Sequence, residues 1–151
     1  MSYLGSKIPF EVDLDLYLNN PMLWQDFEER ISGASEGIKL VLINTATALY
    51  LMDLGVDLNL SDEQLSNIAR IIRDIALGKE YLGDMTALLQ ERLVIDQMLA
   101  QTVSNRLLNE LLKPAMEDIK QVQLKYFQNR IASKATPIGT TKNILNLRKP
   151  S

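Results

Sequence analysis

The chain has 151 residues, of which 46% are hydrophobic and 23% charged, a composition typical of one soluble globular domain. It contains no cysteine and no histidine, which excludes a disulfide framework, most structural zinc sites, iron–sulfur clusters and any Ser-His or Cys-His nucleophilic pair. The net charge of −3 is unevenly placed, because residues 1–112 carry 8 basic and 17 acidic residues (−9), whereas residues 113–151 carry 8 basic and 2 acidic residues (+6).

The N-terminal region has the least regular pattern. Residues 1–9 show no periodicity and no apolar run of the signal-peptide kind, so we expect a flexible segment and a cytoplasmic protein. Between Phe10 and Leu18 every second residue is apolar, which is the period of a half-buried strand. No second strand is evident to pair with it, and Asp13 can cap a short helix instead. We therefore favour a helix here and leave the strand open.

Two helices with clear start signals are predicted next. Asn20 and Pro21 are typical of an N-cap and a first helical position, and an apolar helix face follows as far as Ile31. Ser35 caps a second helix that is apolar on most sides, so we expect it to lie buried at the centre of the protein and to end at Gly55. Its most apolar run is too short and too polar for a membrane span.

The stretch 60–127 is the best-specified part of the chain. Ser61 and Gln64 form a capping-box pattern at the start of a helix that Gly78 ends. The apolar residues that share one face of this helix are Leu65, Ile68, Ile72 and Ile75. The charged residues expected away from that face are Arg70, Arg73 and Asp74.

Three further helices complete the predicted body. Asp84 is placed to cap a short helix and Asp96 a longer one. Pro114 disfavours helical geometry at the preceding residue, so a break is expected before the last helix. We therefore predict an all-α fold, a single compact bundle of about six helices in residues 10–131, followed by a flexible basic tail in residues 132–151.

The order of elements in residues 61–120 resembles a helical module of uncharacterised bacterial proteins. The matching positions are Leu77-Gly78, Met85 to Leu89, Arg92-Leu93-Val94-Ile95, Ala100 and Pro114. All of them are packing and turn positions. The resemblance implies a helical fold and a bacterial protein, and it brings no known activity and no catalytic residues.

Several candidate sites have a structural interpretation that we prefer. Asp13 and Asp15 are two residues apart and do not face each other on a helix, so we expect solvated surface rather than a cation site. The unit 84–112 has the layout of a helix-turn-helix, but Arg106 is the one cation on its second helix. The polar residues expected to be exposed on that helix are Gln97, Gln101, Ser104 and Asn105. Helix caps and polar helix faces account for the acids, so we assign no catalytic, cofactor-binding or metal-binding residue.

The tail is the feature that packing does not explain. Residues 143–149 place three aliphatic and two cationic side chains after a run of Thr, Ser, Pro and Gly. The candidate partner-binding residues are Ile144, Leu145, Leu147, Arg148 and Lys149. Such a segment can add a strand to a partner's sheet or fold as a helix in a groove. It can also dock on its own acidic body or remain inert, and these three interpretations stay open.

From these patterns we predict a non-enzymatic interaction or scaffold protein that recruits another protein, of unknown identity, through the tail. Self-association into a homo-oligomer stays open. The alternative is binding to nucleic acid or to another anionic surface, and the acidic body makes it the second choice. The basic residues that would carry it are Lys120, Lys125, Arg130, Lys134, Lys142, Arg148 and Lys149.

Overall fold

The computed structural model describes residues 7–135, and within that range the chain is all helical, with eight α-helices and no β-strand. The α-helices are α1 (Leu14–Leu18), α2 (Pro21–Ser32), α3 (Glu36–Ile43), α4 (Thr45–Leu58), α5 (Asp62–Ala76), α6 (Met85–Leu93), α7 (Gln97–Arg106) and α8 (Met116–Ala135). Short turns of other helix types, η2 (Leu82–Asp84), η3 (Leu107–Leu111) and η4 (Lys113–Ala115), connect the later helices. The predicted all-α class is confirmed.

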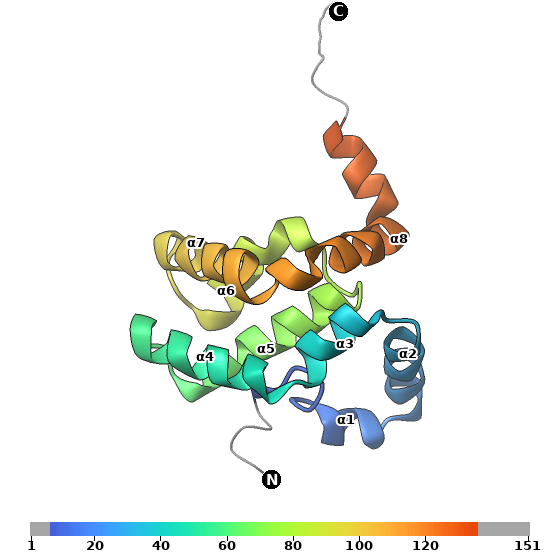
Figure 1. Cartoon of the computed structure of the whole chain (residues 1–151), viewed down its shortest axis with the longest axis horizontal. Coiled ribbons are helices and arrows are strands. Elements are labelled where there is room, and N and C mark those ends of the chain that lie inside the picture. Colours follow the sequence, from blue (N-terminus) through green and yellow to red (C-terminus); the bar gives the residue numbers. More distant parts are fainter. Residues whose placement is uncertain (1–6, 136–151) are drawn as a thin grey trace, which may run out of the picture.

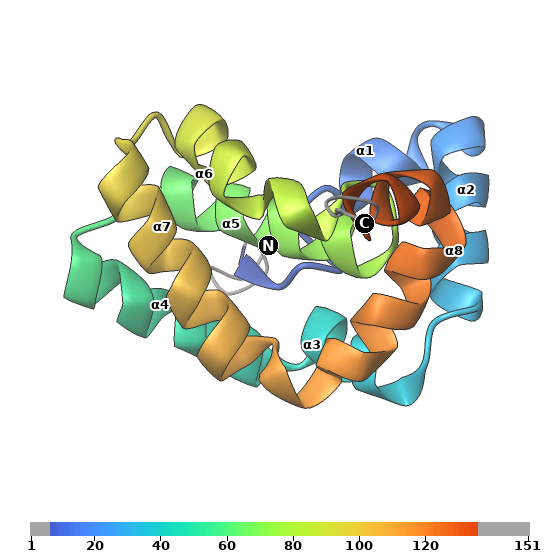
Figure 2. The same ribbon diagram turned by 90° about the horizontal axis from the view of Figure 1, so that it is seen from above.

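The central helix is α5. It packs against α3, α4, α6 and α8, and nine of its 15 residues are buried. In Figure 1, α3, α4 and α5 form the lower part of the body, α6, α7 and α8 lie above them, and α1 and α2 close one side. Figure 2 shows α7 leading into α8 along one edge of the molecule. The helix that holds the core together is therefore the one with the clearest amphipathic pattern.

The start of α5 matches its sequence signals. The Ser61 amide donates to Gln64 Oε1 at 2.8 Å, and the Gln64 amide donates back to Ser61 Oγ at 3.1 Å, which completes the predicted capping box. At the other end, Gly78 has φ +78°, a left-handed conformation that glycine adopts without steric cost. The predicted end of the helix is confirmed.

The N-terminal segment packs more closely than expected. Lys7, Ile8 and Pro9 are buried, although we expected a flexible segment up to residue 9. The Lys7 ammonium lies 3.4 Å from the carboxylate of Asp62 at the start of α5. The segment that follows forms turns and then α1, so the helical interpretation of the region is confirmed and the strand is not formed.

The helix expected from Ser35 to Gly55 is divided in two, which corrects the prediction. Asn44 is extended, with φ −78° and ψ 133°, and its side chain accepts a hydrogen bond from the Ala46 amide at 2.9 Å. It therefore ends α3 and caps α4. Gly55 lies inside α4, where an added Cβ would come 2.7 Å from Leu65, and the left-handed cap is Asn59 instead.

The pair α3–α4 is also less buried than predicted. Leu40, Ile43 and Leu49 are each more than half exposed, so the pair lies at the edge of the body and α5 occupies the centre. Within the described residues, no single helix has the length and apolar composition of a membrane span. The pair α3–α4 meets that test only when its two parts, bent by 55°, are taken together.

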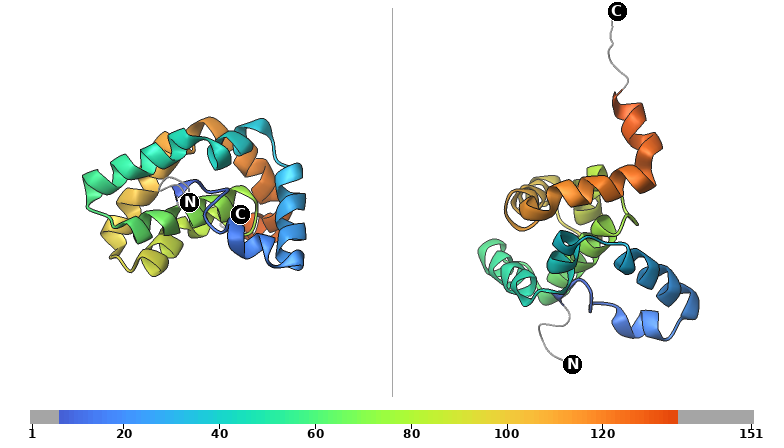
Figure 3. Two further views of the ribbon diagram at one scale, coloured as in Figure 1. Left: turned by 90° about the horizontal axis from the view of Figure 1, so that it is seen from below. Right: turned by 45° about the vertical axis from the view of Figure 1, so that its right-hand side comes forward.

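The helical path from α7 to the end of α8 is interrupted twice. The π-helical turn η3 and the 3₁₀ turn η4, which contains Pro114, separate α7 from α8 where the break was predicted. Within α8, Phe127 has φ −128° and ψ 31°, which is not helical. The helix beyond it points away from the body (Figures 1 and 3), although Arg130 still contacts Asp84. The helix continues to Ala135, beyond the predicted end at residue 131.

Candidate functional site

The predicted partner-binding residues Ile144, Leu145, Leu147, Arg148 and Lys149 lie outside the described residues, as do Lys142 and the side chain of Lys134. The structure does place the basic residues of α8. Arg130 makes a bidentate contact with Asp84, with N–O distances of 2.8 and 3.0 Å. Lys120 lies 3.8 Å from Glu117, and the Lys125 ammonium lies 5.2 Å from the centre of the Tyr126 ring.

This arrangement also corrects the role of Asp84. It occupies the N-cap position of α6, but its carboxylate makes no capping hydrogen bond. The carboxylate instead holds Arg130, whose guanidinium also lies over the Tyr81 ring at 4.2 Å from the ring centre. Tyr81 packs in turn against Phe127, with ring centres 5.5 Å apart. The second half of α8 is therefore attached to the turn before α6 through its polar side.

An apolar depression lies between that turn and α8, and we call it the α8 groove. Its lining residues are Tyr81, Leu82, Gly83, Lys120, Gln123, Leu124 and Ile131, and its volume is about 370 Å³. Leu124 is 45% exposed, and Tyr81, Leu82 and Ile131 are the other large apolar residues of the lining. Leu124 and Ile131 lie on either side of the break at Phe127, and both line the groove.

Gln123 fixes the wall of the α8 groove. Its amide nitrogen donates to the carbonyls of Ile75 and Glu80, both at 3.0 Å, and its amide oxygen accepts from the Leu82 amide at 2.7 Å. The Gln123 side chain is buried, and its three bonds satisfy backbone groups that are buried or partly buried. Gln123 thus ties α8 to the loop that forms the other side of the groove.

A second depression of about 480 Å³ lies where α3 meets α4, opposite η3 and η4. The Tyr50 hydroxyl donates to Glu110 at 2.6 Å at its margin, and Arg106 binds the same carboxylate and Asp57. Burial, with the hydrogen bond to Glu110 and its charge, raises the pKa of the Tyr50 hydroxyl. The same hydrogen bond, with Arg106, lowers the pKa of the Glu110 carboxyl.

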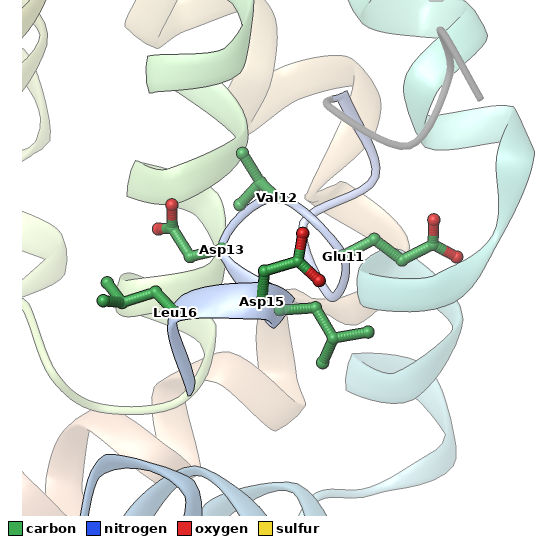
Figure 4. A pocket seen from close by; sticks show the side chains of 6 residues that line it. Glu11, Val12, Asp13, Asp15 and Leu16 are labelled. Carbon is green, nitrogen blue, oxygen red and sulfur yellow. The ribbon is translucent and has the colours of Figure 1, made fainter. Parts of the chain in front are cut away.

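A third depression, of about 540 Å³, follows one short segment from Glu11 to Leu16. Figure 4 shows Asp13 turned to one side of this loop and Glu11 to the other. Asp15 is exposed, as expected, but Asp13 is not solvated surface, which corrects the prediction. Its carboxylate binds Arg73 at 2.7 Å and Arg70 at 3.1 Å.

These contacts belong to a buried ion network that sequence reasoning missed. Arg73 was expected away from the core but is 4% exposed, and its guanidinium bridges Asp13 and Asp74. The network continues through Arg92, which binds Asp74 and Glu80. It joins the N-terminal loop to α5 and α6. Burial alone would raise the pKa of Asp13, but hydrogen bonds from Arg73 and Arg70, and their charges, hold it below its ordinary value.

The acidic groups within residues 7–135 can be compared with the requirements of metal binding and of general acid catalysis. Among these residues no group of three or more acidic side chains is placed to hold a metal ion. The two resolved carboxyl pKa shifts, at Asp13 and Glu110, are both downward. A general acid near neutral pH needs an upward shift, so neither carboxyl is suited to that role.

The one cation that the helix-turn-helix interpretation could use is already paired with carboxylates of the chain. Arg106 is held by Asp57 and Glu110, and Ser104, which we expected to be exposed, is buried. Gln97, Gln101 and Asn105 remain exposed on α7. Without a free cation, this helix has little to offer a phosphate backbone.

Comparison with known proteins adds no relative: no family model, no curated protein and no solved structure matches the chain. The resemblance of residues 61–120 to an uncharacterised bacterial module stays an expectation.

Proposed function

We propose that this is a non-enzymatic interaction protein that recruits another protein through residues 143–149, which we call the C-terminal segment. The observation that carries the proposal is the course of α8. The helix loses its helical geometry at Phe127 and, although Arg130 still binds Asp84, its C-terminal end points away from the body (Figure 3). An attachment point of this kind favours recognition of a linear segment by a partner.

The use of polar residues in the body supports the same proposal. Arg73, Arg92, Arg106 and Arg130 each bind one or more carboxylates of the chain itself. The buried Gln123 serves backbone groups only. These side chains therefore stabilise the fold. The aliphatic and cationic side chains of the C-terminal segment have no fold-stabilising role assigned to them.

The composition of the segment indicates the kind of partner. Ile144, Leu145 and Leu147 would supply apolar contacts, and Arg148 and Lys149 would bind acidic groups at the margin. Such a segment fits an apolar groove with acidic residues beside it, entered either as an added strand or as a short helix.

The test compares co-purifying proteins from the native source for three chains: the full chain, one that ends at Lys142, and one with Arg148→Gln and Lys149→Gln. We expect the truncated chain to lose a defined partner and the charge variant to retain a weakened interaction. An unchanged set of partners after truncation contradicts the proposal. Helix content by circular dichroism confirms that the body is intact.

The alternative is binding to nucleic acid or to an anionic surface, favoured by the absence of acidic residues after Asp118. Arg130 and Lys120 count against it, because both already lie beside carboxylates. This alternative predicts affinity for nucleic acid that falls steeply as salt is added. Lack of binding to single- and double-stranded DNA and RNA at low salt would remove it.

A further inference from the structure

The α8 groove borders the place where the described chain ends. Ile131 lines the groove and lies one helical turn before Ala135, the last residue of α8. Leu124 lines the same groove, together with Leu82 and Tyr81 from the turn before α6. Covering the exposed part of Leu124 and its neighbours would remove apolar surface from water, which is favourable. The groove therefore suits an apolar occupant that arrives from the end of α8.

We propose that the C-terminal segment of the same chain docks in the α8 groove, with its aliphatic residues against Leu124 and Leu82. The reach of the chain supports this occupant. From Ala135 to Ile144 there are nine residue steps, which span up to about 30 Å when extended. Leu124 lies eleven residues before Ala135, or about 17 Å along a straight helix. The remaining length allows the chain to reverse direction, and Pro137 and Gly139 are residues that turns favour.

Three other depressions fit this occupant less well. The one between α3 and η4 lies before the first residue of α8, so the chain would have to return past the whole of that helix to reach it. The depression along Glu11–Leu16 lies by α1, whereas the last turns of α8 project from the opposite side of the body (Figures 1 and 3). A small one beside Tyr126 has about 60 Å³, which is too little for two leucine side chains.

The spacing of the aliphatic residues suits a narrow groove. In an extended chain Leu145 and Leu147 point to the same side, about 7 Å apart. In a helical turn Ile144 and Leu147 share a side instead. Either conformation presents two aliphatic side chains to the groove at once. The contact is mainly apolar, so its salt dependence should be weak, unlike that of phosphate binding.

Docking within one chain needs little intrinsic affinity. A short linker gives an effective concentration in the millimolar range, so a contact with a dissociation constant of about 1 mM is already substantially formed. Such a contact would also regulate the interaction proposed above, and this part rests on that proposed function. A partner that binds the C-terminal segment would have to displace the segment from the groove. The smaller the undocked fraction of the segment, the weaker the partner's apparent affinity.

Paramagnetic relaxation enhancement tests the docking without a partner. The chain has no cysteine, so Ser151→Cys provides one site for a nitroxide label. We expect broadening of the amide signals of residues 81–83 and 124–131 in the ¹⁵N-labelled chain. The broadening should not change on dilution. It should be absent when a ¹⁵N-labelled chain without nitroxide is mixed with a nitroxide-carrying chain at natural isotope abundance, because docking occurs within one molecule.

Three variants complete the test. Leu145→Asp with Leu147→Asp alters only the occupant, and Leu124→Asp alters only the groove. The matched control is Leu16→Asp, because Leu16 is 57% exposed and remote from the groove. We expect both of the first two variants to lower the docked-to-free ratio at least about tenfold, and the control to leave it unchanged.

Three results would overturn the proposal: no broadening at the groove in the unmodified sequence, broadening that survives the occupant variant, or broadening that requires the mixed sample. Circular dichroism shows whether Leu124→Asp still folds, and the occupant variant keeps the test decisive if it does not. If docking is not observed but partner binding is, the proposed function stands and the docking proposal falls. If docking is observed but partner binding is not, the docking proposal stands and the proposed function falls.

Discussion

The guanidinium of Arg73 donates a 2.7 Å hydrogen bond to the carboxylate of Asp13, across 60 residues of sequence. We expect Asp13→Asn to lower the free energy of unfolding by about 1–3 kcal/mol, because a buried cation loses a charged partner while Asp74 remains. Urea unfolding measures the change. The control is Asp15→Asn, at an exposed residue two positions later, which should change stability by less than about 0.5 kcal/mol. Equal effects would show that the network does not stabilise the fold.

The same pair predicts a pH dependence with a definite sign. The pKa of Asp13 is lower in the folded protein than its ordinary value of 3.8. A carboxyl of this kind contributes stability above its unfolded pKa and loses that contribution as the pH falls through its folded pKa. The stability difference between the unmodified protein and Asp13→Asn should therefore be full at neutral pH and shrink below about pH 4. A difference that is constant down to pH 2 would contradict this assignment.

The local parts of the fold could be predicted from the sequence because their signals are local. Asn20, Ser35, Ser61 and Asp96 were each predicted as N-caps, and each side chain accepts a hydrogen bond from an amide two or three residues into its helix. Capping depends on a few adjacent residues, so a short window contains the whole interaction. The exceptions are Asp13 and Asp84, which make no capping hydrogen bond because distant arginines, Arg73 and Arg130, bind their carboxylates instead.

The long-range features could not be predicted in the same way. Arg73 has the sequence appearance of a solvent-facing residue, and only the folded chain brings Asp13 to it. The α8 groove joins the turn at residues 81–83 to residues 120–131, and neither part has a pattern that indicates the other. The break at Asn44 was missed because one polar residue inside an apolar run is compatible with a continuous helix. In the structure, the Asn44 side chain instead caps the next helix.

Gln123 offers a test of the loop that supports the α8 groove. Gln123→Leu leaves the Ile75 and Glu80 carbonyls and the Leu82 amide without this partner. We expect a loss of about 1–3 kcal/mol in the free energy of unfolding, because buried polar groups that lose their partners carry the full cost of desolvation. Thermal unfolding measures it. Gln121→Leu, at an exposed position on the same helix, should be close to neutral. A neutral Gln123→Leu would mean that water replaces the amide.

Gly78 should be intolerant of even a small side chain. Its φ of +78° disfavours any L residue, and the Tyr126 ring occupies the space of an added Cβ. We expect Gly78→Ala to cost about 1–3 kcal/mol by urea unfolding. Gly33→Ala is the control, because Gly33 has φ −85° and an added Cβ would meet its nearest atom at an ordinary 3.6 Å. That change should be neutral or slightly stabilising.

Replacing Val94 by glycine should increase stability although it removes a side chain. It ends α6 in the left-handed conformation, with φ 55° and ψ 56°, which is costly for a β-branched residue. Its side chain is 87% exposed, so little packing offsets the strain. We expect Val94→Gly to raise the free energy of unfolding by about 1 kcal/mol, because glycine removes the clash at the helix end.

The matched control for this gain is Val56→Gly. Val56 is 84% exposed as well, but it lies inside α4 with ordinary helical geometry. Glycine there should cost up to about 1 kcal/mol, since it adds flexibility to the unfolded chain without relieving strain. Urea unfolding of both variants separates the two effects, because exposure is the same and only the backbone conformation differs. If Val94→Gly destabilises the protein as much as Val56→Gly does, the left-handed geometry at Val94 carries no strain.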